Sequence, residues 1–325
     1  MTATEKFRAQ VRALAAMLTL AAMASVALSA PARAQVEFRW KYTEGERLTQ
    51  TVVQETTMNM LVMDQVVSNK SRQTFSMEWL VKSVDDEGNG TVELRIGRIQ
   101  LKIDMTGMSL EFDTAAEEKP AGQAAMLADV LGKLVGIHYI VEMSPRGEVL
   151  SVELPEATKK AFQQIPGVEQ MFGNLNADGI KQMMGQANLL PAGPVAVGDT
   201  WRAEDEQDVP LFGRKKSSVD FTYEGTEERE EGTFDKISYE VHMNFGEAAP
   251  AGFPGKIEVR NEQFRGVIFF DRQKGRMHDS QMDFSMDMLM NINGQEAEQQ
   301  VAGAVYITLA PTVGSPGAEP SAGDE

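Results

Sequence analysis

Methionine side chains gather in two short stretches of this sequence, and their thioethers are its most distinctive reactive groups. The first stretch is MNMLVM, residues 58–63, and the second is MDFSMDMLM, residues 282–290. Thioethers are soft ligands that suit Cu(I). They are also flexible, polarizable groups that suit binding surfaces for varied apolar partners. A third interpretation is core filling, in which each buried methionine contributes about 1.5–3 kcal/mol.

Alternation along the second stretch favours apolar contact over metal ligation. Its even positions are apolar and its odd positions are mostly polar, and successive side chains of a β-strand point to opposite faces. The even row includes Phe284 and Ile292, which cannot bind a metal, and no His or Cys is close in sequence. We therefore rank core filling first, a lipid-like ligand surface second and copper third. The candidate ligand-face residues are Met58, Met60, Met282, Phe284, Met286, Met288 and Met290.

The other reactive residue types form no catalytic pattern. The three histidines, His138, His242 and His278, have no second histidine at ligand spacing, so no zinc signature is present. Asp279 follows His278, but neighbouring strand residues face opposite ways, so we do not expect it to orient the imidazole. G-x-S-x-G, P-loop and G-x-G-x-x-G patterns are absent from the sequence. We expect a non-enzymatic protein with no catalytic residue, no metal and no cofactor.

Two acidic features are better explained by turns than by chemistry. The run EERE at 227–230 lacks the spaced oxygens and the glycine of a calcium loop, so we expect a solvated hairpin tip. Asp199, in the segment GDTW, is expected to brace a tight turn by accepting a hydrogen bond from the backbone.

The first 34 residues have the pattern of a secretory signal. A basic segment with Lys6, Arg8 and Arg12 precedes an apolar run over residues 13–30, and Ala32 and Ala34 form an A-x-A site. We expect cleavage before Gln35 and an exported protein, periplasmic or extracellular. No later stretch is apolar enough to span a membrane, so we expect no integral span after cleavage.

Charge and cysteine content narrow the possible partners. Residues 1–34 hold four basic residues and one acidic residue, which leaves 27 Lys and Arg against 47 Asp and Glu. Such an acidic chain repels phosphate groups, so nucleic-acid binding is not expected. The sequence has no cysteine, which excludes disulfides and thiolate chemistry.

Turn signals and period-two apolar patterns predict a mainly antiparallel β protein with a small helical insert. An example is the row Phe75, Met77, Trp79 and Val81, which ends before the turn DDEGNG. A phase slip in the next strand predicts a β-bulge near Gly97–Arg98. Residues 293–294, Asn-Gly, predict a tight hairpin. Spacings of three and four predict helices over 121–136, 155–165 and 176–186.

Three segments of the first half reappear in similar form and in the same order in the second half, which indicates an internal duplication. The expected organisation is a signal peptide at 1–34, a first β-rich half at 35–187 with its helical insert at about 121–187, a joint at 188–198, a second half at 199–310 and a disordered tail at 311–325.

Several segments, above all P-V-x-x-G-D-T-W from Pro194 to Trp201, resemble an uncharacterised family of exported bacterial proteins found in planctomycete-type genomes. That resemblance implies an exported, β-rich protein and brings no catalytic residues. A looser likeness of architecture exists to half-barrel carriers of lipids and lipoproteins in the bacterial envelope.

The sequence therefore predicts an exported envelope protein that binds an apolar ligand or a partner protein through its Met-rich surface. The alternative is a structural or assembly protein of the envelope with a packed core and no ligand. A copper-binding protein ranks behind both.

Overall fold

The computed structural model describes residues 34–62, 65–105, 107–117, 120, 122–165, 177–184, 190–209, 213–243, 247–248, 255–292 and 295–312. Residues 1–33 of the expected signal peptide, the Asn-Gly pair at 293–294 and residues 313–325 lie outside this set. The chain divides into two compact units, Met1–Gln35 and Val36–Glu325.

Strands dominate the described residues, which confirms the expected mainly antiparallel β class. The strands are β1 (Gln35–Val36), β2 (Arg47–Val62), β3 (Gln65–Val84), β4 (Gly90–Met105), β5 (Met108–Asp113), β6 (His138–Met143), β7 (Val149–Glu153), β8 (Val195–Ala196), β9 (Thr200–Val209), β10 (Gly213–Arg229), β11 (Gly232–Met243), β12 (Glu247–Ala248), β13 (Gly255–Asp271), β14 (Arg276–Ile292) and β15 (Gln295–Pro311). The described helices are α2 (Gln123–Leu134), α3 (Glu156–Gln163) and α5 (Ala177–Met184), each inside a segment expected to be helical.

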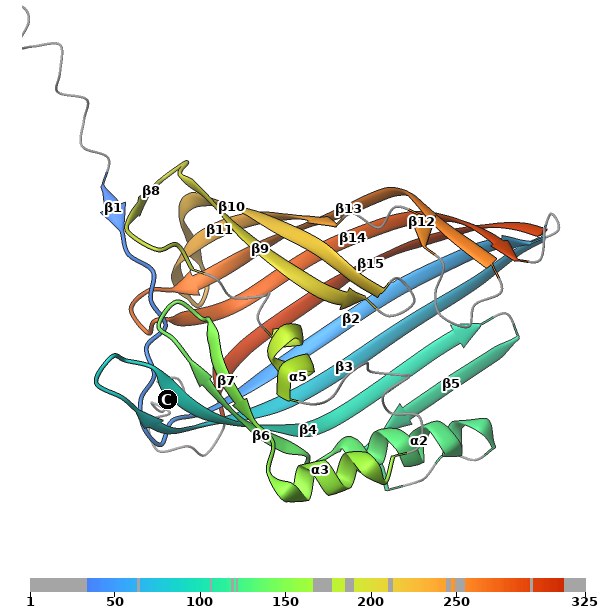
Figure 1. Ribbon diagram of the computed structural model, residues 1–325, viewed down its shortest axis with the longest axis horizontal. Helices are drawn as coiled ribbons and strands as arrows, with labels where there is room; N and C mark the ends of the chain where they lie inside the picture. The colour runs from blue at the N-terminus through green and yellow to red at the C-terminus, as the bar shows by residue number, and fades with distance from the viewer. Residues whose placement is uncertain are drawn as a thin grey trace, which may run out of the picture. The chain divides into compact units, whose positions relative to one another are not determined.

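One large antiparallel sheet contains all of these strands except β1 and β8. Its order is β7-β6-β4-β3-β2-β15-β14-β13-β11-β10-β9, with β5 added beside β4 and β12 beside β13. The last strand in the chain, β15, therefore lies beside the first long one, β2, in the middle of the sheet (Figure 1). The pairing runs from Leu48 opposite Pro311 to Leu61 opposite Glu298, so Pro311 belongs to a strand and not to the expected tail.

The strand register gives the sheet two different ends. Four short turns, at 85–89, 144–148, 230–231 and 272–275, lie at one end, which we name the packed end. At the other, the distal end, β2 meets β3, β4 meets β5 and β14 meets β15. The expected Asn-Gly hairpin lies at this end, where Ile292 pairs with Gln295.

The segment from Glu37 to Tyr42 crosses the packed end and ties two hairpins together. The Trp40 backbone N–H donates to the Pro145 carbonyl at 2.7 Å, and the Lys41 N–H donates to the Gly275 carbonyl at 2.8 Å. Gly275 has φ +64°, and a Cβ there would lie 2.3 Å from Lys41 Cγ, so this turn requires glycine. The side chain of Phe38 is fully buried between the strands.

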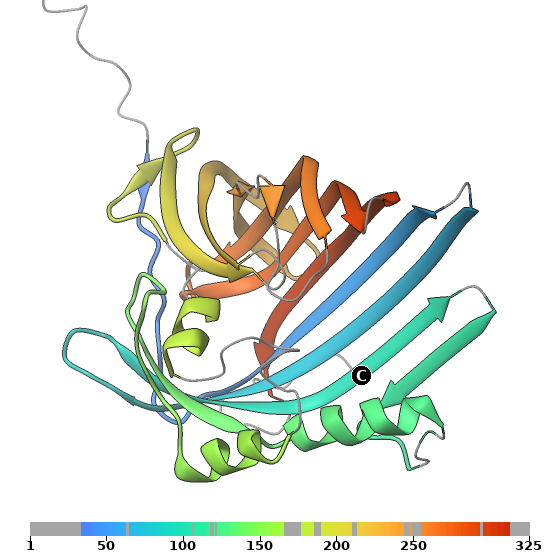
Figure 2. The same cartoon turned by 45° about the vertical axis from the view of Figure 1, so that its right-hand side comes forward.

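The helices pack on one face of the sheet, which we name the inner face. Leu131 and Leu134 of α2 form a core cluster with Ile99 and Leu101 of β4. Helix α5 contacts both β7 and β9, the first and last strands of the sheet order, and Figures 1 and 2 show it between them. The sheet therefore curls until its two edges reach the same helix.

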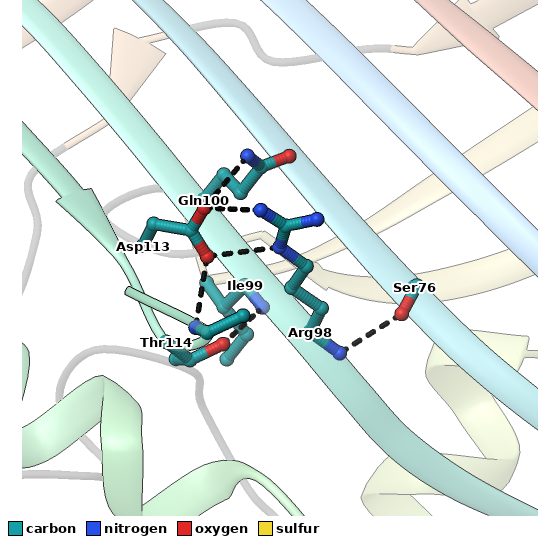
Figure 3. Close-up of polar contacts among 7 residues, drawn as sticks. Ser76, Arg98, Ile99, Gln100, Asp113 and Thr114 are labelled. Atoms are coloured by element: carbon teal, nitrogen blue, oxygen red, sulfur yellow. Dashed lines mark hydrogen bonds and ion pairs between the residues drawn. The ribbon is translucent and has the colours of Figure 1, made fainter. Parts of the chain in front are cut away.

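The expected bulge is present in β4 and keeps its apolar residues on the inner face. Ile96 pairs with Met77 and Ile99 pairs with Phe75, so two residues of β4 stand opposite Ser76. Ser76 Oγ accepts a hydrogen bond from the Arg98 N–H at 2.9 Å (Figure 3). The Arg98 side chain pairs with Asp113 of β5, and its hydrogen bonds hold the pKa of that carboxyl well below its usual range.

The expected duplication remains a prediction. The four turns that it pairs lie at one end of one sheet, and the two halves share an up-and-down strand order, β2-β3-β4-β6-β7 and β9-β10-β11-β13-β14. Any meander has that order, so it does not distinguish duplication from a simple continuation of the sheet. Superposition of the two halves, with an unrelated meander as the control, is the test.

Candidate ligand-binding face

The structure brings the two methionine stretches together on the inner face, although 218 residues, 64–281, lie between them in the sequence. Met286 lies opposite Val301 of β15, and Val301 lies opposite Met58 of β2. One register step nearer the distal end, Met288, Gln299, Met60 and Val67 form a second row across β14, β15, β2 and β3. All seven candidate residues therefore share one face.

These residues differ in burial, which distinguishes the side chains that fill the core from those that are partly exposed on the inner face. Met288 and Met290 are 9% and 8% exposed and form a small core cluster with Ile257 and Ala297. Met58, Met60, Met282, Phe284 and Met286 are half-buried. The expected alternation is confirmed, since Asp283 and Ser285 are exposed on the outer face. The methionines nearest the distal tip of β14 are core residues, and the others present sulfur and methyl groups to the inner surface.

Phe284 has a defined packing role. It lies opposite Gly303, where an added Cβ would come within 2.7 Å of the Phe284 ring and 2.0 Å of the Glu55 carbonyl oxygen. The aromatic ring covers the glycine and also stacks with Phe264 at a centroid distance of 6.2 Å. Phe284 therefore anchors the sheet locally, and only its remaining surface is available for contact.

No Asp, Glu, Lys or Arg occupies an inner-face position in the described parts of β2, β3, β4, β14 and β15. The register assigns these positions to Leu48, Gln50, Val52, Gln54, Thr56, Met58, Met60, Val67, Asn69, Ser71, Gln73, Phe75, Met77, Trp79, Val81, Val92, Leu94, Ile96, Ile99, Leu101, Ile103, Met105, Met277, Ser280, Met282, Phe284, Met286, Met288, Met290, Ala297, Gln299, Val301, Gly303, Val305, Ile307 and Leu309. The charged residues of the same strands stand on the outer face or in bulges.

A narrow strip of uncharged polar side chains runs along β2 and β3 within this face. The strip consists of Gln54, Thr56, Asn69, Ser71 and Gln73. Apolar residues of β15 flank it on one side and those of β4 on the other. The Oδ1 atom of Asn69 is buried and has no hydrogen-bond partner among the described residues. The sequence pattern does not reveal this strip, because its polar residues interrupt the apolar alternation that marks the methionine row.

A described pocket of about 400 Å³ lies on the other side of the sheet. Its lining consists of Glu55, Thr56, Thr57, Lys70, Ser71, Arg72, Lys102, Asp104, Asp283, Gly303 and Ala304. Arg72 pairs with Glu55 across it. The lining is polar and of mixed charge, so this pocket is not the apolar cavity that a lipid-like ligand would occupy.

The other residues singled out from the sequence have structural partners. The imidazole of His278 stacks on Phe234 at 4.3 Å, and its Nε2 lies 3.7 Å from Asp279, which pairs instead with Arg229 at 2.7 Å. Asp199 braces its turn as expected, because its Oδ2 accepts a hydrogen bond from the Ala196 N–H at 2.9 Å.

The acidic run at 227–230 leads into the tip of the hairpin between β10 and β11. The described residues contain no group of three His, Cys, Asp or Glu side chains placed to hold a metal ion.

Four tyrosines of the described residues have raised pKa values. Burial raises the pKa of Tyr139 to about 12. Burial and a hydrogen bond to Asp235, at 2.6 Å, raise the pKa of Tyr223 to about 12. Burial also raises the pKa of Tyr42 and Tyr239. These tyrosines remain neutral at physiological pH and contribute packing and hydrogen bonds.

Comparison with known families gives one match. Residues 87–230 match the "Family of unknown function (DUF6263)". The matched region includes the Pro194–Trp201 motif, in agreement with the resemblance to an uncharacterised family. The exported, planctomycete-type character of that family is not part of the match. No curated protein matches the sequence.

Similar solved structures share little sequence with this chain. Lipovitellin, from a structure concerned with its lipid–protein interactions, has 10% identity and a TM-score of 0.47, covering 86% of this chain and 27% of its own. A Bacteroides fragilis protein with a YmcC-like fold, itself inferred to be exported, has 12% identity and a TM-score of 0.26, covering 82% of this chain and 98% of its own. DynF from Micromonospora chersina has 7% identity and a TM-score of 0.20, covering 86% of each chain.

The chain spans only about a quarter of lipovitellin's length. Within the described residues, every helix is too short or too polar to cross a membrane.

Proposed function

We propose that this protein is an exported, non-enzymatic binding protein that holds an apolar, lipid-like ligand on the inner face of its sheet. The observation that carries the proposal is the absence of charged residues from the described inner-face positions of five long strands, in a chain of net charge −17. A face that only water reached would accept charged residues as readily as the outer face does. A partly exposed face without them suits an apolar ligand.

Partial exposure of the apolar side chains supports the proposal. Met58, Met60 and Met286 are half-buried, and Val67, in the same row as Met60, is 51% exposed. Methionine side chains adapt to ligands of different shape because they are unbranched and polarizable. Each side chain that a ligand covered would gain transfer free energy at about 25 cal/mol per Å² of apolar surface.

The uncharged polar strip on β2 and β3 limits the chemistry of the ligand. Gln54, Gln73 and Asn69 offer amide groups, while Thr56 and Ser71 offer hydroxyl groups. These groups can donate to or accept from a neutral polar group, but they cannot neutralise a charge. The strip therefore favours a lipid-like ligand with an uncharged polar group.

The export part of the proposal rests on the sequence of residues 1–34. Cleavage before Gln35 would leave β1 intact, since that strand begins at Gln35. Intact-mass measurement of the protein recovered from its own cells tests this step. A mature chain that still carried the apolar run of residues 13–30 would contradict it.

A structural or assembly protein of the envelope is the second candidate. The tight burial of Met288 and Met290 favours it, because part of the Met-rich row is core. If the remaining inner face were filled by other parts of the chain, the protein would need no ligand.

Native mass spectrometry of protein purified from its own cells distinguishes these candidates. A ligand-binding protein is expected to retain lipid-sized mass that organic extraction releases. A fluorescent fatty alcohol then serves as a probe of the inner face. Met286→Glu is expected to weaken its binding at least about tenfold, because a ligand covering this position would have to desolvate a carboxylate.

Leu289→Glu is the matched control for this experiment. Leu289 belongs to the same strand and is also half-buried, but it lies on the outer face. Its substitution is expected to leave probe binding within about twofold, because the ligand would not reach it. Absence of both retained lipid and probe binding in the wild-type protein would favour the structural candidate.

A further inference from the structure

Exposed apolar side chains gather at the tips of two neighbouring hairpins at the distal end. The described residues expose seven large apolar side chains, and four of them belong to the hairpins β2–β3 and β4–β5. These four are Leu61, Val66, Val67 and Met108, which are 40%, 67%, 51% and 45% exposed. The hairpins are neighbours because β3 pairs with β4. Single exposed apolar residues are ordinary on a protein surface, but a group confined to protruding tips is not.

The tip of the β2–β3 hairpin is apolar on both faces. Leu61 and Val66 lie opposite each other on the outer face, whereas Met60 and Val67 lie opposite each other on the inner face. A ligand held on the inner face could cover only the second pair. To cover both pairs, an apolar environment must contact the tip from both sides, and the interior of a bilayer does so.

The backbone hydrogen-bonding groups of this hairpin are paired between its two strands, as an apolar environment requires. Its strands pair without a break from Arg47–Leu80 to Val62–Gln65, so inter-strand hydrogen bonds reach the last described pair. Unpaired N–H and C=O groups are what keeps irregular segments out of hydrocarbon. The paired part of this hairpin presents mainly side chains to its surroundings.

Charge distinguishes the tip from the rest of the molecule and indicates the type of membrane. Among residues 56–69 only Asp64 is charged, although the chain as a whole has a net charge of −17. Behind the tip, Glu298 lies opposite Leu61, while Lys70 lies opposite Asp104. This collar carries both signs, which matches zwitterionic headgroups. An anionic surface would repel the acidic molecule.

We propose that the distal hairpin tips, through Leu61, Val66, Val67 and Met108, dock into the surface of a bilayer of zwitterionic lipid. Val67 and Met108 belong to the inner face, but Leu61 and Val66 lie on the outer face, which the proposed ligand would not cover. The proposal therefore does not rest on the proposed function. Docking would place the Met-rich part of the inner face, around Met60 and Met286, next to the lipid. It would also direct the packed end away from the membrane.

Flotation of the purified protein with phosphatidylcholine vesicles tests the proposal. Wild-type protein is expected to float with the vesicles. The double variant L61D/V66D is expected to bind at least about tenfold less, because two side chains that would leave water become charged. Vesicles rich in phosphatidylglycerol are expected to bind the wild type more weakly than phosphatidylcholine does.

The control variant is V197D/Y306D, which adds the same two charges at sites away from the tips. Val197 and Tyr306 are 52% and 38% exposed, close to the values of the tip residues. This variant is expected to float as the wild type does, and thermal unfolding of both variants verifies that they fold. Equal loss in the two variants, or no flotation of the wild type, would overturn the proposal.

Two further measurements distinguish bilayer docking from dimerisation through the tips and from ligand binding on the inner face. Light scattering that showed a wild-type dimer, converted to monomer by L61D/V66D, would overturn it and make the tips a contact between two copies. Native mass spectrometry of L61D/V66D is expected to show the same retained lipid as the wild type. Loss of flotation with retained lipid therefore tests docking alone, whereas absence of lipid from both proteins counts against the proposed function.

Discussion

The packed end and the distal end belong to the same sheet but have different interiors. At the packed end Phe38 is fully buried, and its ring meets those of Tyr223 and Phe270 edge-to-face at 5.2 and 5.6 Å. At the distal end Met58, Met60 and Met286 are only half-buried. Both ends are apolar, so hydrophobicity alone does not make them different.

The difference lies in what covers the inner face at each end. The segment from Glu37 to Tyr42 and helix α5 fill the packed end, where aromatic rings interlock. Helix contacts of the described residues concentrate on β4, β5, β7 and β9, and not on the central strands. Interlocking aromatic rings fill the packed end, whereas half-buried methionines such as Met58 and Met286 line the part of the inner face that is left partly open.

The largest effect is expected from emptying the packed end. Phe38→Ala should lower the free energy of unfolding by about 3–5 kcal/mol, because the rings around Phe38 cannot close the cavity. Urea unfolding measures the loss. Phe264→Ala at the half-buried inner face is the comparison, and less than half the effect is expected there. Equal losses at the two sites would remove the distinction between the two ends.

A charge introduced into the methionine row should reveal where that row changes from core to surface. Met288→Asp places an unpaired carboxylate at a site that is 9% exposed, and about 3 kcal/mol of stability should be lost. Met286→Asp, two residues away and half-buried, should cost less than half as much. Thermal unfolding of the two variants gives the comparison. A larger loss at Met286 would mean that the assignment of core and surface is reversed.

Alkaline pH should destabilise the packed end before the distal end. The pKa of Tyr139 is raised from 10.0 to about 12 in the folded protein, so the unfolded chain ionises first as the pH rises. Stability from this residue is fully present below pH 10 and is lost between about pH 10 and 12, on the order of 2 kcal/mol. Unfolding free energies measured across this range test the prediction. Tyr139→Phe should have a smaller decline, and an identical decline would contradict the assignment.

The smallest effect is expected from exchanging methionine for leucine. The triple variant M286L/M288L/M290L should lose less than about 1.5 kcal/mol per site, because the two side chains have similar volumes. A Cu(I) competition assay, together with thermal unfolding, shows whether these methionines only pack in the core or also bind copper. Micromolar or tighter Cu(I) binding by the wild type, lost in a variant that still folds, would make this a metal protein and reverse our ranking.

The sequence by itself determined the local structure. Period two predicted the strands, and spacings of three and four predicted the helices α2, α3 and α5. The phase slip before Ile99 predicted the bulge, because only an extra residue can return Ile99 to the face of Ile96. Asp199 predicted its own turn, since its hydrogen-bond partner lies three residues away. Each of these depends on residues close together in the chain.

The tertiary structure alone decided the candidate site. Alternation assigned Met58 and Met286 to apolar faces, but only the pairing of β15 with β2 placed those faces side by side. Alternation also could not distinguish buried Met288 from half-buried Met286, because both occupy even positions of the same alternating apolar row. Burial depends on strands and helices that arrive from distant parts of the chain, and long-range pairing is set by the free energy of the whole sheet, not by any local pattern.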